Sequence, residues 1–385
     1  MLIFRFVLSH ILISASLFAQ SFDDEREQQM RFRELLTPFQ QALKERDPVQ
    51  LRMQWLVVSQ LDEHVLVPLL DLCEEYSSPA EMAWITTAID KITSRSLHKL
   101  EFENLEPRLL DTKRSGRGRR VVLSILERIK PGYRDGFLLS VESDPEFHRD
   151  YMSSQIDKAV QIRDQGNIGE ANGLLTQLYD RAIDAEQIVS IYNMIEEQSN
   201  LVSLHEKLGL ISEWKVIGPF PSEKAKGPEQ TYPVESQYLN EQLDISQSYA
   251  VDGKSLDWKS FEIGKDVTSL KFGQVLAGRN DSVYFAATTV HSDVKKRVEL
   301  LASGGETIQL WHNGVLVIDA PFYNQRPRLD RYRCLVELKE GDNTIFAKVC
   351  IGEGGGDGGG RGGAPAGELI LRIVDENGKG LVLKP

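Results

Sequence analysis

The sequence has few cysteines and lacks the residue spacings that mark several common enzyme classes. Only three of its 385 residues are Cys, too few for a chain held together by disulfides. The seven His residues form neither an HxH nor an HExxH pattern, so no zinc site is indicated. The absence of a GxSxG elbow argues against an α/β-hydrolase. The glycine-rich run at 354–363 lacks the GxxxxGK[ST] ending of a phosphate loop and predicts a flexible connection instead.

Basic charge is also scarce. The chain carries 57 acidic and 45 basic residues, a formal net charge of -12. Because the phosphates of nucleic acid require a basic face, we expect no nucleic-acid partner. One stretch, Pro107–Arg134, is locally basic and has two interpretations. Gly116 and Gly118 precede a predicted helix whose start would bind an anion, or the charges simply cover a solvated loop and helix face.

Long apolar runs are confined to the first 20 residues. Arg5 is the only charge there, and the run from Phe6 to Phe18 is largely apolar, with Ala19 at a plausible cleavage position. The run is shorter than the roughly 20 residues of a membrane-spanning helix. It predicts a secretory signal peptide over residues 1–20, with an uncleaved anchor as the alternative. We therefore expect an exported protein, periplasmic or extracellular, that is not an integral membrane protein.

Residues 21–208 show helical periodicity. Asp47-Pro48 supplies an N-cap and a first-turn proline, and Leu51, Trp55 and Val58 follow at helical spacing. Ser77-Ser78-Pro79 separates two further segments of the same kind. Short helices joined by short turns indicate a stacked helical array, of either the HEAT or the tetratricopeptide type.

From residue 209 onward the pattern changes to strands. Glu213–Phe220 begins as a strand and is interrupted by a Gly-Pro pair, and Ser282–Thr289 alternates as a strand does. Asn313-Gly314 predicts a tight hairpin, and Cys334–Leu338 with Thr344–Ile351 predicts another. Short strands at this spacing predict an antiparallel β-sandwich of jelly-roll type over residues 209–385. The fold class is thus multidomain α and β, a helical array followed by a β-sandwich.

The predicted strands also fix expectations for the cysteines and tryptophans. Cys334 and Cys350 would point to opposite faces of the sheet, so we expect free, mostly buried thiols. The tryptophans of the strand region, Trp214, Trp258 and Trp311, are expected in the core rather than on a sugar-binding surface.

Several of these motifs together resemble a known module. The series Trp214-Lys215-Val216-Ile217-Gly218-Pro219-Phe220, then Lys226-Gly227, Tyr232-Pro233-Val234-Glu235, Trp258 and Trp311-His312-Asn313-Gly314, resembles a β-sandwich module of secreted bacterial proteins, in which a HEAT-like or tetratricopeptide-like helical region often precedes it. That module is similar to galactose-binding-like and protective-antigen-type lectin domains. The resemblance implies binding of carbohydrate or a cell surface, by analogy of fold.

The resemblance also bears on calcium. Related lectin-like domains often carry paired Asp residues before the strand that leads to the Trp-Asn-Gly hairpin. Here that position is Ser303-Gly304-Gly305-Glu306. One carboxylate rarely supplies the six to eight oxygen ligands of calcium, so a structural calcium is not supported and we expect no cofactor.

One predicted loop combines groups that bind sugars. Between two strands lie Phe322, Tyr323, Asn324, Arg326 and Arg328. Aromatic faces stack on sugar rings, and amides and guanidinium groups bond hydroxyls or carboxylates. The alternative is a packed surface loop without a ligand.

The sequence therefore predicts an exported, non-catalytic protein that binds extracellular or cell-surface carbohydrate through the β-sandwich. A second hypothesis is a scaffold that holds a protein partner on the helical array. A third is a polysaccharide hydrolase whose carboxylates come from distant parts of the chain. No catalytic residue can be named from the sequence.

Overall fold

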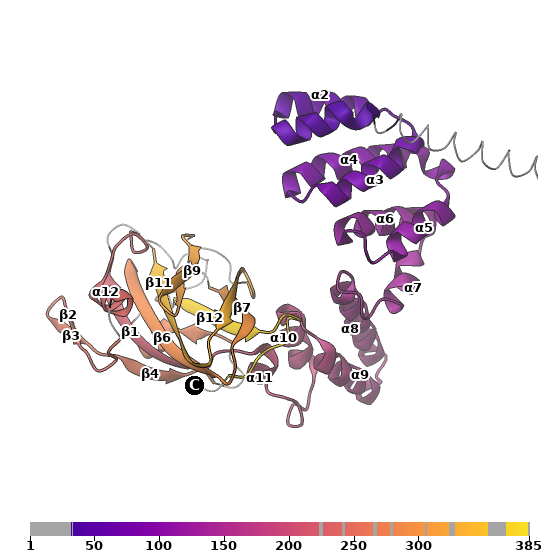
Figure 1. Ribbon diagram of the computed structural model, residues 1–385. Helices are drawn as coiled ribbons and strands as arrows, with labels where there is room; N and C mark the ends of the chain where they lie inside the picture. The colour runs from indigo at the N-terminus through magenta and orange to yellow at the C-terminus, as the bar shows by residue number, and fades with distance from the viewer. Residues whose placement is uncertain are drawn as a thin grey trace, which may run out of the picture. The chain divides into compact units, whose positions relative to one another are not determined.

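The computed structural model describes residues 32, 34–222, 226–240, 243–264, 268–277, 280–304, 306–322, 328–352 and 367–383. Helices come first along the chain and antiparallel sheets follow (Figure 1). The predicted mixed α and β fold class is therefore confirmed. The chain divides into two compact units, Met1–Ser154 and Gln155–Pro385, which are described separately below.

The first unit consists of short helices. Residues 34–45 are helical, and they are followed by α2 (Pro48–Val58), α3 (Leu66–Glu75), α4 (Pro79–Ser96), α5 (Phe102–Leu110), α6 (Gly116–Ile129), α7 (Tyr133–Leu139) and the start of α8 (His148–Asp164). The predicted cap is present, because the Asp47 side chain accepts hydrogen bonds from the backbone N–H groups of Val49 and Gln50. Among the described residues, no helix is both long and apolar enough to cross a membrane.

One apolar core runs through these helices. Phe39 and Leu43 of the first helix, Leu69 of α3, Ile85 of α4 and Leu126 of α6 are all fully buried in it. Each helix contributes apolar side chains at spacings of three and four, which places them on one side of that helix. Burial of each such side chain stabilises the unit by about 1.5–3 kcal/mol.

The second unit combines helices with two sheets. Its helices are the remainder of α8, then α9 (Ile168–Arg181), α10 (Ala185–Met194), α11 (Leu204–Leu208), α12 (Pro233–Asn240) and α13 (Phe272–Val275). One sheet has the strand order β4 (Lys259–Glu262), β1 (Glu213–Pro221), β6 (Ser282–Ser292), β11 (Gly341–Ile351), β8 (Thr307–His312) and β9 (Val315–Ala320). The other has the order β10 (Tyr332–Leu338), β7 (Lys296–Ser303), β12 (Glu368–Val374) and β5 (Leu270–Lys271). A separate hairpin joins β2 (Tyr249–Val251) to β3 (Lys254–Leu256).

The six-stranded sheet is buried on both faces. On β11, Ile345 and Ala347 point into the core shared with the four-stranded sheet. Phe346 and Cys350, on the alternate positions, point into a second apolar cluster on the outer face. The side chains of α12 and of the β2–β3 hairpin complete that cluster, which includes Tyr238. Strands buried on both faces are apolar at consecutive positions, as the run Ile345–Ala347 is.

Two predicted hairpins have different outcomes. Asn313-Gly314 connects β8 to β9, which pair antiparallel, so this prediction is confirmed. The hairpin predicted from Cys334–Leu338 and Thr344–Ile351 is wrong, because β10 pairs with β7 whereas β11 pairs with β6 and β8. Leu338 and Ile345 both enter the shared core, and they do so from opposite sheets. The turn between them therefore crosses from one sheet to the other.

The cysteines are free, as expected, but Cys334 on β10 and Cys350 on β11 lie in different sheets rather than on opposite faces of one sheet. Cys73 and Cys350 are buried and Cys334 is partly exposed. Of the tryptophans expected in the core, Trp214 and Trp311 are buried in the core clusters, whereas Trp258 is only partly buried against the outer cluster. At the Gly-Pro pair of β1, the register with β6 shifts between Ile217 and Phe220, as the predicted interruption of this strand requires.

The change of pattern near residue 208 does not coincide with the division into compact units, which falls within α8. Residues 209–211 run beside β12, where the Ile373 N–H donates to the Gly209 carbonyl at 2.8 Å and the Ile211 N–H donates to the Leu371 carbonyl at 3.0 Å. Gly209 has φ +65°, and a Cβ there would lie 2.3 Å from the Ile373 carbonyl oxygen. The segment that follows α11 is therefore an integral part of the sandwich.

Helices α10 and α11 also belong with the sheets. Leu301, Ile370 and Val374 lie on the outer face of the four-stranded sheet, yet all are buried. Helix α11 contacts β12. Burial lowers the pKa of Arg372 on β12, and Asp184, which caps α10, is one of the carboxylates that oppose this shift. These helices thus help to cover the outer face of that sheet.

We predict that residues 155–385 form a cooperatively folding fragment and that residues 209–385 form a weaker one. Without helices α10 and α11, the side chains of Leu301, Ile370 and Val374 become exposed, which costs about 1.5–3 kcal/mol each. The melting temperature of the shorter fragment should fall by more than about 10 °C, or the fragment should aggregate. Circular dichroism melting of both fragments tests this, and equal melting temperatures would contradict it.

Candidate functional site

A groove of about 1000 Å³ lies on the outer face of the six-stranded sheet. Its lining comes from β1, β4, β6, α12, the segment after α12, and the turns at Asn313-Gly314 and Lys339–Thr344. A volume of this size lies at the upper end of the range that binds small molecules. It is the candidate binding site of the second unit.

Short side chains make the floor of the groove. In the sheet register, Ala287 of β6 faces Lys215 of β1, and Thr289 of β6 faces Thr344 of β11. Further along the same face, the large rings of Phe285 and Phe346 fill the space beneath α12. The change from aromatic to small residues along two neighbouring strands therefore leaves the face hollow at this end.

Helix α12 supplies the apolar wall. The Tyr238 ring stacks on Phe346 with centroids 4.3 Å apart, and its hydroxyl accepts a hydrogen bond from the Gly314 N–H at 3.0 Å. Beyond it, Leu239 and Ile245 are each nearly half exposed and line the groove. The wall is thus held by an aromatic contact and presents aliphatic side chains.

A buried ion pair attaches α12 to the sheet. Lys348 of β11 is fully buried, and its Nζ donates to Glu235 Oε2 of α12 at 2.8 Å and to the Gln230 carbonyl at 2.7 Å. The ammonium also lies 5.3 Å from the centre of the Tyr232 ring. A buried charge that keeps its partners is tolerated, whereas removal of one partner is costly. Lys348 therefore fixes the position of the helix that forms the groove wall.

The opposite wall is polar. Lys215 Nζ donates to the Ser260 hydroxyl at 2.6 Å. Glu213 of β1 lies directly across from Glu262 of β4, and both line the groove. Like charges facing each other across strands are unfavourable, so this pair places two carboxylates at one edge of the groove at some cost in stability.

An amide network holds the turn at the end of the groove. Asn343 is fully buried; its Oδ1 accepts from Asn313 Nδ2 and from the Lys339 N–H, both at 3.0 Å. Asn313 Oδ1 in turn accepts from the Thr344 N–H at 2.9 Å. Burial lowers the pKa of the neighbouring His312, because the charged imidazolium would lose its hydration. The two turns are thus cross-linked, and the groove has a rigid end.

Of the predicted sugar-binding loop, the structure describes only the two ends, Phe322 and Arg328. Phe322 is 56% exposed, and Arg328 forms an ion pair of 3.5 Å with Glu186 of α10. Tyr323, Asn324 and Arg326 fall outside the described residues. The chain leaves β9 after Ala320, which pairs with Ile308 near the start of β8. The groove is at the other end of these two strands, at the Asn313-Gly314 turn. Neither Phe322 nor Arg328 lines the groove.

The position considered for calcium has a packed backbone. A Cβ on Gly304 would lie 2.3 Å from the Glu368 carbonyl oxygen, and the Ser303 hydroxyl accepts from the Arg331 N–H at 3.3 Å. Gly305 is outside the described residues. Within the described part of the chain, no group of three or more His, Cys, Asp or Glu is placed to hold a metal ion.

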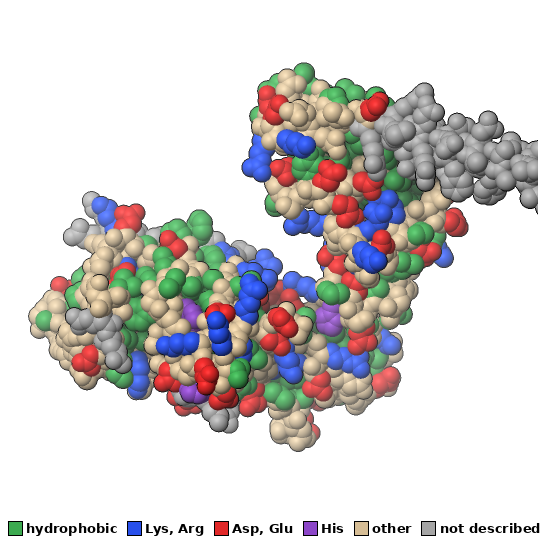
Figure 2. Space-filling view, in the orientation of Figure 1, with side chains coloured by type: hydrophobic (Ala, Val, Ile, Leu, Met, Phe, Trp, Pro, Cys, Tyr) green, Lys and Arg blue, Asp and Glu red, His purple; other side chains and the backbone are tan. Residues whose placement is uncertain are grey.

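Six of the seven arginines in the basic stretch of the first unit pair with carboxylates. The pairs are Arg108 with Asp71, Arg114 with Asp71 and Glu74, Arg119 with Asp144, Arg120 with Glu146 and Asp150, Arg128 with Asp90, and Arg134 with Asp150. Figure 2 shows acidic and basic side chains interspersed over these helices. At the start of α6 the Glu146 carboxyl group already occupies the space beside Gly116. The anion-site interpretation is therefore not supported by the geometry.

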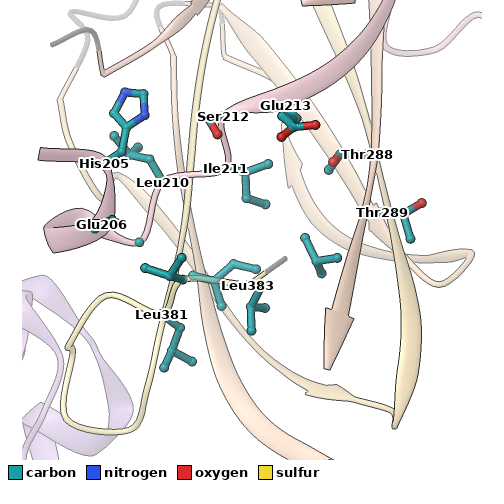
Figure 3. Close-up of a pocket in the computed structure, with 14 residues that line it drawn as sticks. His205, Glu206, Leu210, Ile211, Ser212, Glu213, Thr288, Thr289, Leu381 and Leu383 are labelled. Atoms are coloured by element: carbon teal, nitrogen blue, oxygen red, sulfur yellow. The ribbon is translucent and has the colours of Figure 1, made fainter. Parts of the chain in front are cut away.

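A smaller cavity of about 130 Å³ lies where the chain enters the sandwich. In Figure 3 aliphatic side chains, including Ile211, Leu381 and Leu383, surround it, with His205 and Glu213 at its border. It is well below the size of small-molecule pockets. We regard it as a packing space beside the close contact of Gly209 with Gly380.

Comparisons with known proteins add no assignment. No family model matches the chain, and no curated protein matches it. Solved structures include a β-glucosidase from Kluyveromyces marxianus (10% identity, 42% of this chain and 16% of that chain, TM-score 0.24) and an anti-sigma factor domain-containing protein (13%, 50% and 50%, 0.25). A GH31 α-xylosidase from Xanthomonas citri is a third (13%, 33% and 15%, 0.20). The chain spans at most half the length of these proteins. TM-scores this low do not establish a shared fold.

We predict that the buried pair Arg119–Asp144 stabilises the first unit. Arg119 Nη1 and Nη2 donate to the two carboxylate oxygens at 3.2 and 2.5 Å, and Nε donates to the Leu109 carbonyl at 2.7 Å. Asp144→Asn should cost about 3–5 kcal/mol, because it leaves the buried guanidinium without its counter-charge. Hydrogen exchange of α6 and α8 peptides measures the loss. Arg120→Gln, at a half-exposed pair, is the control and should cost about 1 kcal/mol or less.

The same pair predicts that the first unit loses folding stability at low pH. Burial works against the charged Asp144, but the hydrogen bonds from Arg119 and from backbone N–H groups outweigh it and lower its pKa. The stabilisation is therefore complete above the unfolded pKa of about 3.9 and is lost as the pH falls through the lower folded value. Asp144→Asn should reduce this acid sensitivity, and an unchanged acid profile would contradict the assignment.

Proposed function

We propose that the protein is an exported, non-catalytic binding protein whose β-sandwich binds extracellular or cell-surface carbohydrate in the groove. The observation that carries this proposal is the groove itself, a volume of about 1000 Å³ with an aliphatic wall on one side and hydroxyl, amide and charged groups on the other. The proposal agrees with the resemblance to lectin-like modules noted in the sequence.

The apolar wall and the polar wall of the groove match the C–H surface and the hydroxyl groups of a sugar ring. Leu239 and Ile245 would cover the C–H surface of a ring, where burial of apolar area is favourable. Thr289 and Thr344 carry hydroxyls that both donate and accept, and Lys215 donates, so together they suit ring hydroxyls. Because these groups stand on paired strands, little conformational entropy is lost on binding.

The loop of Phe322–Arg328 stays a second candidate region. Phe322 presents an exposed ring, and exposed aromatic area on a loop is a feature of binding surfaces. The start of the loop follows the end of β9, whereas the groove is at the Asn313-Gly314 turn before β9, so variants at the two places separate the possibilities.

We also propose a more specific fold for each of the two regions. Two antiparallel sheets packed on a shared core support a jelly-roll or galactose-binding-like sandwich. For the helical unit, hydrogen bonds recur at separations of 36, 37 and 38 residues, from Lys99 to Glu63, Arg108 to Asp71 and Arg128 to Asp90. Such a recurrence supports a stacked array of helical hairpins, and hence the alternative role as a protein scaffold.

A hydrolase is the remaining alternative, and one observation favours it. Glu213 and Glu262 face each other on neighbouring strands at the edge of the groove, and glycosidases use a pair of carboxylates. Release of reducing ends from a bound polysaccharide, abolished by Glu213→Gln or Glu262→Gln, would replace the binding proposal by this one.

We predict that filling the groove abolishes carbohydrate binding. Thr289→Trp places a large ring on the floor between β1 and β11, and it should weaken binding on a glycan array by at least about tenfold, the effect of losing about 1.4 kcal/mol. Leu239→Ala should weaken the same ligand by about 1 kcal/mol through lost apolar contact.

Two controls make the result interpretable. Lys295→Ala changes an exposed ion pair with Glu337 away from the groove and should leave binding unchanged. Tyr323→Ala tests the loop: if it removes binding while Thr289→Trp does not, the site lies in the loop and the groove proposal is wrong. Melting temperatures of all variants should stay within a few degrees of the parent.

We also predict cleavage of the first residues on export. Mass spectrometry of the protein recovered from its producing cells should find Gln20 or Ser21 at the mature N-terminus, as expected for a small residue at position 19. Intact Met1 on cytoplasmic protein would contradict the export prediction.

A further inference from the structure

Helix α2 exposes an apolar stripe on the side turned away from its core. Val49, Met53, Leu56 and Val57 are spaced at i, i+4, i+7 and i+8, so they lie on one side of the helix. Each is between 49% and 65% exposed, and Figure 2 shows hydrophobic side chains at the surface over α2. Scattered exposed apolar residues need no explanation, but a continuous stripe marks an interaction surface.

The opposite side of α2 is already used. Leu51 and Val58 are buried, and the Trp55 indole N–H donates to the Thr87 hydroxyl of α4 at 3.1 Å. The Trp55 ring also meets Trp84 edge to face, with centroids 6.3 Å apart. Among the described residues none covers the stripe, since all four of its side chains are about half exposed or more. Helices near the end of a stacked array normally carry a polar outer face, and α2, which follows only the helix of residues 34–45, does not.

We propose that α2 forms the interface of an end-to-end dimer, in which its stripe packs against the same stripe of a second copy of this chain. The chain that precedes the first helix is poorly suited to cover the stripe. Residues 1–20 belong to the proposed signal peptide, and residues 21–31 carry six charged residues with only Phe22 and Met30 as large apolar ones.

The charge of the stripe suits contact with itself. Arg52 is the only charged residue in α2, and the helical spacing places it at the edge of the stripe rather than within it. Two copies related by a twofold axis, the commonest symmetry of oligomers, therefore bury no unpaired charge. A charged or polar partner would find no complementary group on this surface.

The small size of the stripe predicts a weak dimer. Eleven residues make a helix of about 16 Å, and one side of so short a helix buries well below the roughly 800 Å² per partner of stable complexes. The dimer should thus be concentration-dependent, with a dissociation constant in the micromolar range. This inference does not depend on carbohydrate binding.

Sedimentation velocity tests the proposal on the chain from residue 21 to 385, from about 1 µM to about 200 µM, a range that brackets a micromolar dissociation constant. The parent should pass from monomer to dimer mass. Leu56→Glu should raise the midpoint concentration at least about tenfold, because it places a charge in the buried stripe. Leu139→Glu, at another exposed leucine of the first unit, should dimerise like the parent.

Three results would overturn the proposal. They are a parent that stays monomeric up to the highest concentration, a Leu56→Glu variant that dimerises as the parent does, or a Leu139→Glu variant that loses dimerisation equally. Because Leu56 lies away from the core, its melting temperature should match the parent, and Met53→Glu provides a second variant if Leu56→Glu does not fold.

Discussion

The second unit depends on the burial of its six-stranded sheet on both faces. Strand β11 shows this most clearly, because its successive side chains enter two different apolar clusters. A sheet buried only on one face would need neither α12 nor the β2–β3 hairpin. Here both are required, since otherwise Phe346, Phe285 and Trp311 would be exposed to water at a cost of about 1.5–3 kcal/mol each.

The groove follows from the way this outer face is covered. Helix α12 covers only the aromatic part of the face, and it is held there by the stacking of Tyr238 on Phe346 and by the buried Lys348–Glu235 pair. Where the strands change to Ala287, Thr289 and Thr344, no residue that the structure describes covers the sheet, and a hollow remains. The proposed binding site is thus the uncovered end of a face whose other end needs a helix for stability.

In the first unit the main constraint is electrostatic, because many arginines must be paired with carboxylates of the same unit. Each arginine of the basic stretch that forms an ion pair does so with a carboxylate of the same unit, and Arg119 with Asp144 does so in the interior. The charges therefore bind helix to helix rather than an external anion. The apolar stripe on α2 stays exposed, and the proposed association of two copies rests on it.

The sequence alone determined the local features. Helical spacing, caps such as Asp47-Pro48 and turns such as Asn313-Gly314 depend on neighbouring residues, and the helices, the β8–β9 hairpin and the buried tryptophans were predicted from them. The interactions that define the groove and the domain division were not predictable in this way. Lys348 meets Glu235 across more than a hundred residues, β10 and β11 separate into different sheets, and Gly209 packs against Gly380. Only the tertiary structure decided these, because alternation along a strand shows which side chains share a face but not which strand, sheet or helix will cover it.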